Sequence, residues 1–472
     1  MTARDAPAAE RVGLVTVALG TMLAPLNSTM IVVALPTILR EFEYTLAWGA
    51  WIVVAYLVTM AAGQPLGGSL GDRYGQRRLF QIGLVGFLAA SALATLAPSL
   101  AVLIVARTCQ AAAGALVVPN GMALVRSLVA AERHGAAFGR IGAGVAIAAT
   151  IGTPLGGVLT DAFDWRAIFA ANLALIGPAL VLSVRLPAGR TAAQVGRFDL
   201  SGAALLITTL ITLAASLTLW RVAQAPVVLA PLLGLTTIVA GLLLWRHVSD
   251  HPAPVVRLNL FRQSGYAPAS LLALLVNLTM YTVLLSLPVF LTERAGWSSS
   301  ATGVLLAAMS LQMVVFAPFG GWLADRRGWR YPATLGSVLL AAGALALVSI
   351  DTGWGWAVYL GPLVLIGAGV GLSSAPTQAL AVDAAPAAAA GQAAGLFSTT
   401  TYLGSILGSA GMAAILGDGV PTTASFRLLY VAVSIAAILG VLAAVRLPAG
   451  HGRRVDEQPD QAAARDLAPS RR

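Results

Sequence analysis

The sequence predicts an all-α membrane protein with many spans, because it is apolar, poor in charge and built from apolar runs of spanning length. Of its 472 residues, 58% are hydrophobic and 10% are charged. Soluble domains carry about 25% charged residues, so this chain lacks the polar residues that a water-exposed surface of its size needs. The apolar runs are about 20 residues long, the length of a helix that crosses a bilayer core of about 30 Å.

Fourteen apolar runs can be distinguished, each bounded by charges, Pro/Gly clusters or tryptophan. The first run is too long and too weakly flanked for a cleaved signal peptide, so we expect it to be retained. All ten tryptophans fall near run ends, as an interfacial aromatic belt predicts. The expected spans are 12–34, 48–68, 79–97, 100–122, 136–160, 166–186, 199–219, 226–246, 265–291, 299–322, 332–350, 354–381, 391–416 and 424–446.

The arginines orient these spans. With fourteen spans both termini lie on one side, and 23 of the 29 arginines then fall on that side; the chain has no lysine. Basic residues stay in the cytoplasm, so we expect cytoplasmic termini in a bacterial inner membrane, the bacterial origin being suggested by the Ala/Gly/Arg-rich composition. The other arginines are Arg40, Arg166, Arg221, Arg294 and Arg427 on the far side and Arg107 within a span.

Several kinds of site are excluded by composition. Without lysine the chain forms neither a Walker-A phosphate loop nor a lysine Schiff base. Cys109 is the only cysteine, so an intrachain disulfide is impossible. The four histidines are expected in cytoplasmic loops or the tail, and no metal-ligand cluster or nucleophile–base pair is found. We therefore expect no cofactor, no metal and no enzyme activity, and the orientation explains the net charge of +10 without a nucleic-acid partner.

An internal repeat divides the chain. PLGGSLGDRYGQR (65–77) aligns without gaps with PFGGWLADRRGWR (318–330), and eight of thirteen residues match. Each segment follows a predicted span, the second and the tenth, so the tenth span is the second span of another copy. We expect an N-terminal six-helix bundle in 1–190, an inserted helix pair in 191–262, a second six-helix bundle in 263–450 and a disordered cytoplasmic tail in 451–472.

Two six-helix halves with GGSLGDRYGQRR after the second span resemble the major facilitator superfamily, and the inserted pair resembles its fourteen-spanner drug:proton antiporter branch, which exports multiple drugs. The resemblance covers residues 12–446 and implies that the loop after the second span latches the halves together on the inside. The simpler alternative is that its arginines only set topology. The expected gating residues are Gly68, Asp72, Arg73, Gly75, Arg77 and Arg78, and Gly321, Asp325, Arg326, Gly328 and Arg330 in the second copy.

Glycines in two spans predict close helix packing. In the loop motif Gly68 and Gly71 should let their helix approach another, and Asp72 should end it. The fifth span, GAGVAIAATIGTPLGGVL (142–159), resembles the family's antiporter signature, although Pro154 lies one residue later than the usual Gly-Pro pair. We expect a hinge there, formed by Gly144, Gly152, Pro154, Gly156 and Gly157.

Arg107 is the only ionisable side chain placed within the hydrocarbon, in LIVARTCQAAAGALVVPN (103–120). A charge there costs at least about 2.5–3.5 kcal/mol, so Arg107 should face the bundle interior or a wet cavity, or else snorkel to the outer surface. The segment resembles the family's fourth-helix motif at Leu103, Arg107 and Gln110. Other polar residues within spans either line a cavity or bond neighbouring helices: Thr29, Tyr56, Gln64, Asn277, Tyr281, Gln312, Gln378, Gln392 and Tyr402.

The first span carries LNSTMIVVALP (26–36), which resembles a family motif that has aspartate where this chain has Asn27. Asn27 and Arg107 each lie seven residues from the outer ends of their predicted spans, about 10 Å deep, so they should meet. An asparagine cannot titrate and so cannot carry a proton. All 19 acidic residues fall in loops, tails or span ends, and the span-end candidates for a proton route are Asp72, Asp164 and Glu293.

The resemblance implies a monomeric inner-membrane transporter that works by alternating access, binds a small molecule and lies among lipids. Two modes of transport remain open: export of an amphipathic molecule in exchange for protons, or uniport or exchange, without proton coupling, of an anionic or polar metabolite through Arg107. A transport-dead sensor or a membrane enzyme is the alternative from another class, although no loop is long enough for a signalling domain.

Overall fold

The computed structural model describes residues 6–129, 134–186, 199–220, 226–251, 254, 258–384, 390–417 and 421–449. Within these ranges the regular structure is entirely helical. The predicted tail lies outside them. The helices are α1 Ala6–Phe42, α2 Leu46–Gly49, α3 Trp51–Tyr74, α4 Gln76–Thr95, α5 Leu100–Leu128, α6 His134–Ala162, α7 Arg166–Ser183, α8 Leu200–Leu219, α9 Leu229–Asp250, η2 Leu258–Arg262, α10 Tyr266–Glu293, α11 Ser299–Arg327, α12 Arg330–Leu347, α13 Trp356–Asp383, α14 Ala390–Leu416 and α15 Thr423–Val445.

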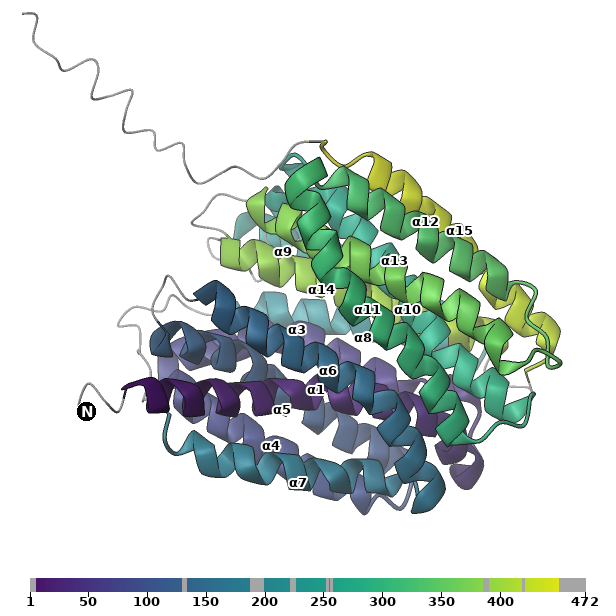
Figure 1. Ribbon diagram of the computed structural model, residues 1–472, viewed down its shortest axis with the longest axis horizontal. Helices are drawn as coiled ribbons and strands as arrows, with labels where there is room; N and C mark the ends of the chain where they lie inside the picture. The colour runs from purple at the N-terminus through teal and green to yellow at the C-terminus, as the bar shows by residue number, and fades with distance from the viewer. Residues whose placement is uncertain are drawn as a thin grey trace, which may run out of the picture.

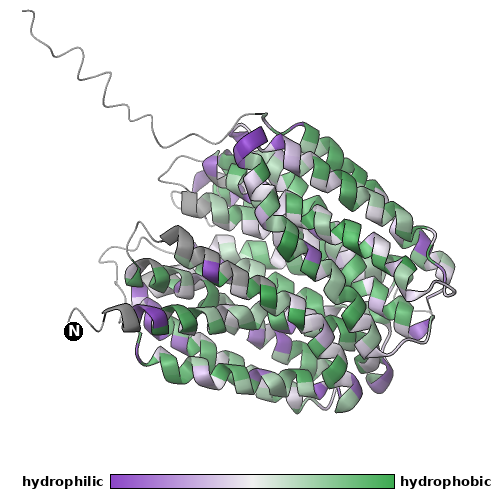
Figure 2. Cartoon of the chain, in the orientation of Figure 1, coloured by the Kyte–Doolittle hydropathy of each residue, from purple (hydrophilic) through white to green (hydrophobic). Residues whose placement is uncertain are grey.

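The all-α membrane class is confirmed. In the described part of the chain, each predicted span corresponds to one long helix, and twelve helices are both long and apolar enough to cross a bilayer. The two other long helices are α6 and α14, for which spanning stays a prediction. Figure 2 shows hydrophobic residues along the helices and hydrophilic residues gathered towards their ends, as a bilayer-spanning bundle requires.

Several helix ends differ from the predictions. The first helix was expected to end at 34, before Pro36, but α1 runs on to Phe42 with Pro25 and Pro36 inside it. Membrane helices tolerate proline because neighbouring helices satisfy the freed backbone groups. The prediction that Asp72 ends its helix was also wrong: α3 continues to Tyr74 and stops at Gly75, whose φ of 99° suits glycine.

Two groups of helices form separate bundles, one above the other in Figure 1. In the first, α1, α3, α4, α5, α6 and α7 pack together, with α4 on α5 and α1 on α6. In the second, α10 to α15 pack together, with α13 between α11 and α12. We call these the N-terminal and C-terminal bundles. They meet along two seams, where α6 packs on α11 and α3 packs on α14.

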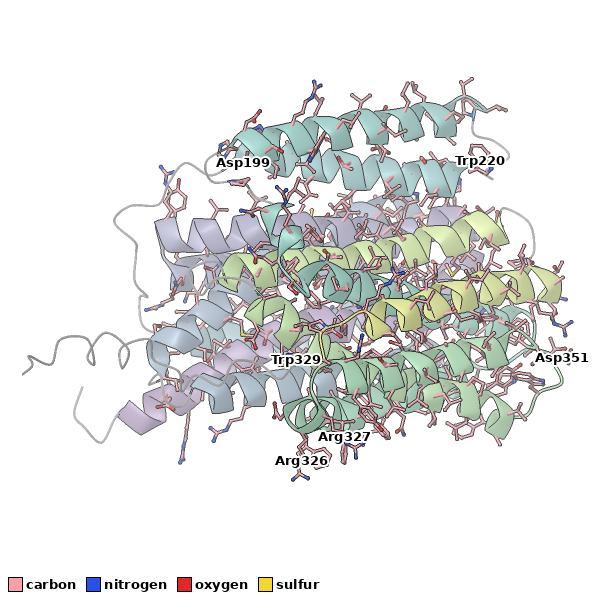
Figure 3. All side chains as sticks on the ribbon, turned by 90° about the horizontal axis from the view of Figure 1, so that it is seen from above. Asp199, Trp220, Arg326, Arg327, Trp329 and Asp351 are labelled. Atoms are coloured by element: carbon pink, nitrogen blue, oxygen red, sulfur yellow. The ribbon has the colours of Figure 1, made fainter. Side chains whose placement is uncertain are left out.

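The pair α8 and α9 lies outside both bundles. α8 contacts α3 of the N-terminal bundle and α14 of the C-terminal bundle, and α9 packs on α8 (Figure 1). Figure 3 shows this pair along one edge of the molecule. Exposed apolar side chains cover α9, as expected of a helix that faces lipid: Leu232, Leu235, Ile238, Val239 and Leu242.

The helix ends define two faces. α1 begins and α15 ends at the same face, on the left in Figure 1, which we call the terminal face. In Figure 3, Asp199, Arg326 and Arg327 lie towards this face, and Trp220 and Asp351 lie at the opposite face. Trp220 is exposed, as expected of an interfacial residue, but Trp165 is fully buried and donates a 2.5 Å hydrogen bond to Glu41. Trp165 therefore joins α7 to the end of α1.

Candidate transport site

A buried arginine lies among helices of the N-terminal bundle. Arg107, on α5, is fully buried, and its guanidinium donates to Asn27 Oδ1 on α1 and to Gln110 Oε1, at 3.1 Å. Its Nε faces the carbonyl of Ile52 at 3.5 Å. A charge away from water needs hydrogen bonds or a partner, so these three oxygen atoms hold the side chain in place. Snorkelling to the surface is thereby excluded.

The partners of Arg107 are neutral. Its guanidinium lies 4.2 Å from the centre of the Tyr56 ring, within cation–π range. Gln110 Nε2 in turn donates a 2.8 Å hydrogen bond to Ser91 Oγ, which extends the network. None of the salt bridges among the described residues includes Arg107. The positive charge is therefore solvated by amides, a carbonyl and an aromatic face, without a carboxylate.

Asn27 is only half satisfied. Its Oδ1 accepts from Arg107, whereas its buried Nδ2 has no hydrogen-bond partner among the described residues. An unpaired buried polar group costs about 1–3 kcal/mol. The sequence correctly predicted that Asn27 and Arg107 meet. The depth argument was less accurate, because α1 extends eight residues beyond its predicted end.

A second polar contact joins the two bundles further along α3, towards the terminal face. Gln64 of α3 donates a 3.0 Å hydrogen bond to the hydroxyl of Tyr402 on α14. Tyr281 of α10 lies near enough to interact electrostatically with both Tyr56 and Arg107. Tyr281 of the C-terminal bundle therefore lies near the buried arginine, and a relative movement of the bundles would change the surroundings of Arg107.

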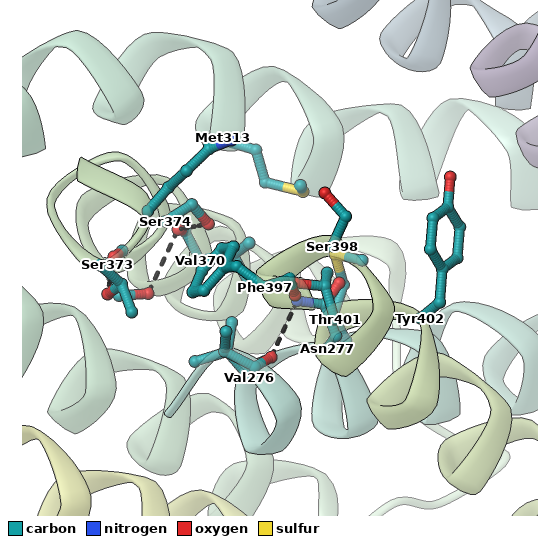
Figure 4. A pocket seen from close by; sticks show the side chains of 14 residues that line it. Val276, Asn277, Met313, Val370, Ser373, Ser374, Phe397, Ser398, Thr401 and Tyr402 are labelled. Carbon is teal, nitrogen blue, oxygen red and sulfur yellow. Dashed lines mark hydrogen bonds between the residues drawn. The ribbon is translucent and has the colours of Figure 1, made fainter. Parts of the chain in front are cut away.

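A cavity of about 290 Å³ lies in the C-terminal bundle, between α10, α11, α13 and α14 (Figure 4). Its walls combine apolar side chains with neutral polar ones, and among the described lining residues Tyr402 alone is ionisable. The lining residues are Ala273, Val276, Asn277, Met280, Met313, Val370, Ser373, Ser374, Thr377, Gln378, Phe397, Ser398, Thr401 and Tyr402.

Seven of the twelve predicted cavity residues fall into two groups. Asn277, Gln378 and Tyr402 line the cavity, whereas Asn27, Tyr56, Arg107 and Gln110 belong to the arginine network. Thr29 bonds its own helix backbone and faces α6, and Gln312 packs against Gly367. The side chain of Gln392 lies outside the described residues.

Sequence reasoning missed the hydroxyl groups of the cavity. Five lining residues are serine or threonine, in the segments SSAPTQ (373–378) and STTTY (398–402). Most of these hydroxyls donate to a carbonyl one turn back, as Ser374 does to Val370 at 2.6 Å. Such local bonds let hydroxyls sit in apolar helices without a partner helix. The local density of Ser and Thr was the available signal.

The predicted hinge residues of α6 lie at two helix contacts. Gly152 and Gly156 face α1, and a Cβ on Gly156 would lie 2.7 Å from the backbone of Met30. Gly157 faces the other way, against the backbone of Ser299 on α11, and Gly303 of α11 packs on the backbone of Thr153. These glycines let α6 pack closely on its own bundle and on the other one.

Polar contacts reinforce this seam at the opposite face. Asp161, at the end of α6, accepts a 2.7 Å hydrogen bond from the backbone nitrogen of Ser300 at the start of α11. Arg40 of α1 lies 3.2 Å from Glu293 of α10, in an exposed ion pair. Both contacts cross from one bundle to the other.

The gating residues contact their own bundles at the terminal face. Arg77 donates a 2.7 Å hydrogen bond to the carbonyl of Val184, Arg73 lies over Tyr74, and Arg327 lies over Tyr331. Arg326 stacks on Trp322 at 4.2 Å, and Arg78, Asp325 and Arg330 are exposed. Gly75 and Gly328 end α3 and α11 with positive φ. The Asp72 side chain lies outside the described residues.

Of the two glycines predicted to pack closely in the loop motif, Gly71 does so and Gly68 does not. A Cβ on Gly68 would find only ordinary contact, 3.7 Å from Pro119, and one on Gly321 would meet nothing within 4 Å. Gly67 instead packs on the backbone of Ala115, and Gly71 packs on Asn120. The helix turns by about 100° per residue, so adjacent glycines face different neighbours.

One group contradicts the expectation that the chain has no metal-ligand cluster. Asp199, His247 and His251 lie together at the terminal-face ends of α8 and α9. His247 was expected in a loop, but α9 continues to Asp250 and includes it. Asp199 and His247 are 48 residues apart in the sequence, and the packing of α8 on α9 brings them together. Sequence spacing alone therefore did not indicate the cluster.

Comparison with known proteins agrees with this architecture. The profile described as Major Facilitator Superfamily matches residues 17–409. Multidrug resistance protein Stp of Mycobacterium tuberculosis is 31% identical over 87% of this chain and 76% of its own length. Tetracenomycin C resistance and export protein of Streptomyces glaucescens is 30% identical over 86% of this chain and 76% of its own length. Riboflavin transporter RibZ of Clostridioides difficile is 26% identical over 88% and 90%.

Proposed function

The chain belongs to the major facilitator superfamily, and from that premise we propose that it exports small amphipathic organic molecules, such as drugs, antibiotics or related metabolites, by alternating access. Family membership and its transporter relatives make it a multi-pass membrane transporter rather than an enzyme. Its bacterial relatives indicate the inner membrane. The arginine bias supports a cytoplasmic terminal face.

The observation that carries export of amphipathic molecules is the lining of the cavity. Apolar groups such as Val276, Met313 and Phe397 alternate there with hydroxyls and amides. Ligand pockets of this kind bury an apolar body and orient it with a few polar groups. Two relatives are named for drug resistance or export, which supports the same substrate class.

The contacts between the bundles support a mechanism in which one bundle rocks against the other about the region of Arg107 and the cavity. Two links between the bundles, Asp161 to Ser300 and Arg40 to Glu293, lie at the opposite face, and the bond from Gln64 to Tyr402 lies between the two faces. At the terminal face Arg73, Arg77 and Arg327 contact their own bundle. We infer a state closed at the opposite face, with the loops at Asp72 and Asp325 as latches that engage when the terminal face closes, and α6 as the hinge.

Coupling to protons would need a carboxylate that changes its surroundings during the cycle. Of the three candidate carboxylates, Glu293 pairs with Arg40 across the two bundles, and Asp164 pairs with Arg166 at 2.9 Å. Opening the opposite face would separate Glu293 from Arg40, which makes Glu293 the carboxylate whose surroundings change most directly in the cycle. We propose Glu293 as the first proton-carrier candidate to test.

The neutral surroundings of Arg107 favour one alternative function. Because Arg107 has only neutral partners, a substrate carboxylate or another polar anion could supply the missing negative charge. Transport would then be uniport or exchange of an anionic or polar metabolite. A relative named as a riboflavin transporter is consistent with a metabolite substrate.

Uptake into inside-out vesicles separates these functions. Ethidium, riboflavin and carboxyfluorescein serve as cationic, neutral and anionic fluorescent probes, with and without a pH gradient and a protonophore. We expect uptake of ethidium above that of vesicles carrying Arg107→Ala. Uptake of carboxyfluorescein alone, unaffected by protonophore, would support the alternative. Failure of all three probes, followed by unchanged sensitivity of expressing cells to a panel of toxic compounds, would contradict drug export.

A further inference from the structure

The cluster of Asp199, His247 and His251 has the composition of a metal site. His247 and His251 are four residues apart at the end of α9, so they share one face of the helix. Their ring centroids are 5.1 Å apart. Asp199 precedes α8, and its Oδ1 lies 2.6 Å from His247 Nε2. One ligand atom from each of the three residues falls within 4.8 Å of the others.

The three ligand atoms are close to the spacing that one ion requires. Metal–nitrogen and metal–oxygen bonds of about 2.0–2.2 Å place the ligands of a tetrahedral ion about 3.3–3.5 Å apart. The Asp199 and His247 atoms would have to separate by less than about 1 Å, which side-chain rotation allows. Two imidazoles and one carboxylate suit zinc and neighbouring divalent metals better than magnesium or calcium, which prefer oxygen.

Hydrogen bonds hold the Asp199 carboxylate in position, as second-sphere groups hold a metal ligand. The side chain is 1% exposed, and its Oδ1 also accepts from the backbone nitrogen of Gly202 at 2.7 Å and from Ser201 Oγ at 3.2 Å. Such hydrogen bonds fix a ligating carboxylate in position. The two histidines are partly exposed, and His251 lies on the wall of a cavity of about 680 Å³ between α9 and η2, which provides a route of entry.

We propose that Asp199, His247 and His251 bind one divalent transition-metal ion of the zinc class at the terminal-face end of the α8–α9 pair. The ion would fasten the start of α8 to the end of α9. Because α8 contacts both α3 and α14, the site would stiffen a helix that touches both bundles. The simpler alternative is that Asp199 only caps α8 and hydrogen-bonds His247.

Zinc titration of the full-length protein tests the proposal. The protein carries no polyhistidine tag, is purified in detergent, stripped with a chelator and titrated with zinc sulfate by calorimetry. We expect one equivalent to bind, and His247→Ala and His251→Ala each to weaken binding at least about tenfold, since even outer-sphere changes cost 10–100-fold. His134→Ala and His451→Ala are the matched histidine controls and should bind as the wild type does.

One variant distinguishes a metal ligand from a helix cap. Asparagine caps helices as well as aspartate does, so Asp199→Asn should keep the melting temperature measured in chelator but lose the rise in melting temperature on adding zinc. Its zinc affinity should fall at least about tenfold. The proposal is overturned if the wild type binds no stoichiometric zinc, if Asp199→Asn binds zinc normally, or if the control histidines matter equally. Magnesium should not compete.

Discussion

Replacing Asn27 with aspartate would place a group that can bind and release a proton directly against Arg107. The exchanged atom is Nδ2, which is buried and has no hydrogen-bond partner among the described residues. Replacing Nδ2 therefore removes no hydrogen bond made among the described residues, and Oδ1 still accepts from Arg107. We expect transport to become more dependent on a pH gradient.

The expected energies show that the variant should fold. Two unit charges about 4 Å apart attract by about 4 kcal/mol at an effective dielectric constant of 20. Burying a carboxylate costs several kcal/mol, so the two contributions nearly cancel. The effect on transport is separate: one coupled proton moving down a gradient of one pH unit supplies 1.36 kcal/mol, which corresponds to about tenfold more substrate accumulation.

Proteoliposomes with a gradient of one pH unit measure this effect, using the probe that the wild type transports best. The ratio of accumulation with and without the gradient should rise up to about tenfold from the wild type to Asn27→Asp. Asn277→Asp is the matched control, because Asn277 lines the cavity and is absent from the hydrogen bonds to Arg107. An unchanged ratio in Asn27→Asp, or an equal rise in the control, would refute the reasoning.

Four further variants test the site and the seam. Arg107→Lys should lower probe uptake at least about tenfold at equal expression, because a single ammonium cannot reproduce the planar fork that reaches several oxygens; near-normal uptake would contradict it. Gly157→Val should weaken the contact between α6 and α11 at the opposite face by about 1–3 kcal/mol through overpacking. A cysteine introduced into this contact should then be labelled faster than in the wild type, and slower labelling would contradict the prediction. Arg40→Ala should change the same labelling less than about fivefold, since exposed ion pairs contribute about 0–1 kcal/mol. Tyr402→Phe should alter the apparent affinity for the probe about two- to tenfold through loss of one hydrogen bond, as measured by concentration-dependent uptake; an unchanged affinity would remove Tyr402 from the site.

The fold class could be predicted because it depends on local information. Each spanning run can be recognised from its own hydrophobicity. In a bilayer core the backbone must satisfy its own hydrogen bonds, which favours a helix. The pairing of Asn27 with Arg107 could also be predicted, because polar groups at similar depth in lipid have few other partners. Depth alone does not locate a helix end, however, and α1 passes through Pro36 where the pattern suggested a stop.

The cavity and the histidine cluster depend on packing between helices that are distant in sequence. Ser374 and Thr401 bond their own helices, so their sequence is equally compatible with a buried helix contact and a cavity wall. Asp199 and His247 meet only because α8 packs on α9. The direction in which a glycine such as Gly157 faces likewise depends on the neighbour present, which single-chain periodicity does not specify.

The placement of α8 makes the two flanks of the transporter unequal towards the lipid. On one flank α8 and α9 stand outside the contact between α3 and α14. On the other flank, side chains such as Ile151 and Val158 of α6 and Val304 and Leu311 of α11 are about half exposed beside the seam. Among the described residues no helix pair covers the junction of α6 with α11 as α8 and α9 cover that of α3 with α14. A molecule dissolved in the acyl chains would therefore have lateral access from one side of the transporter.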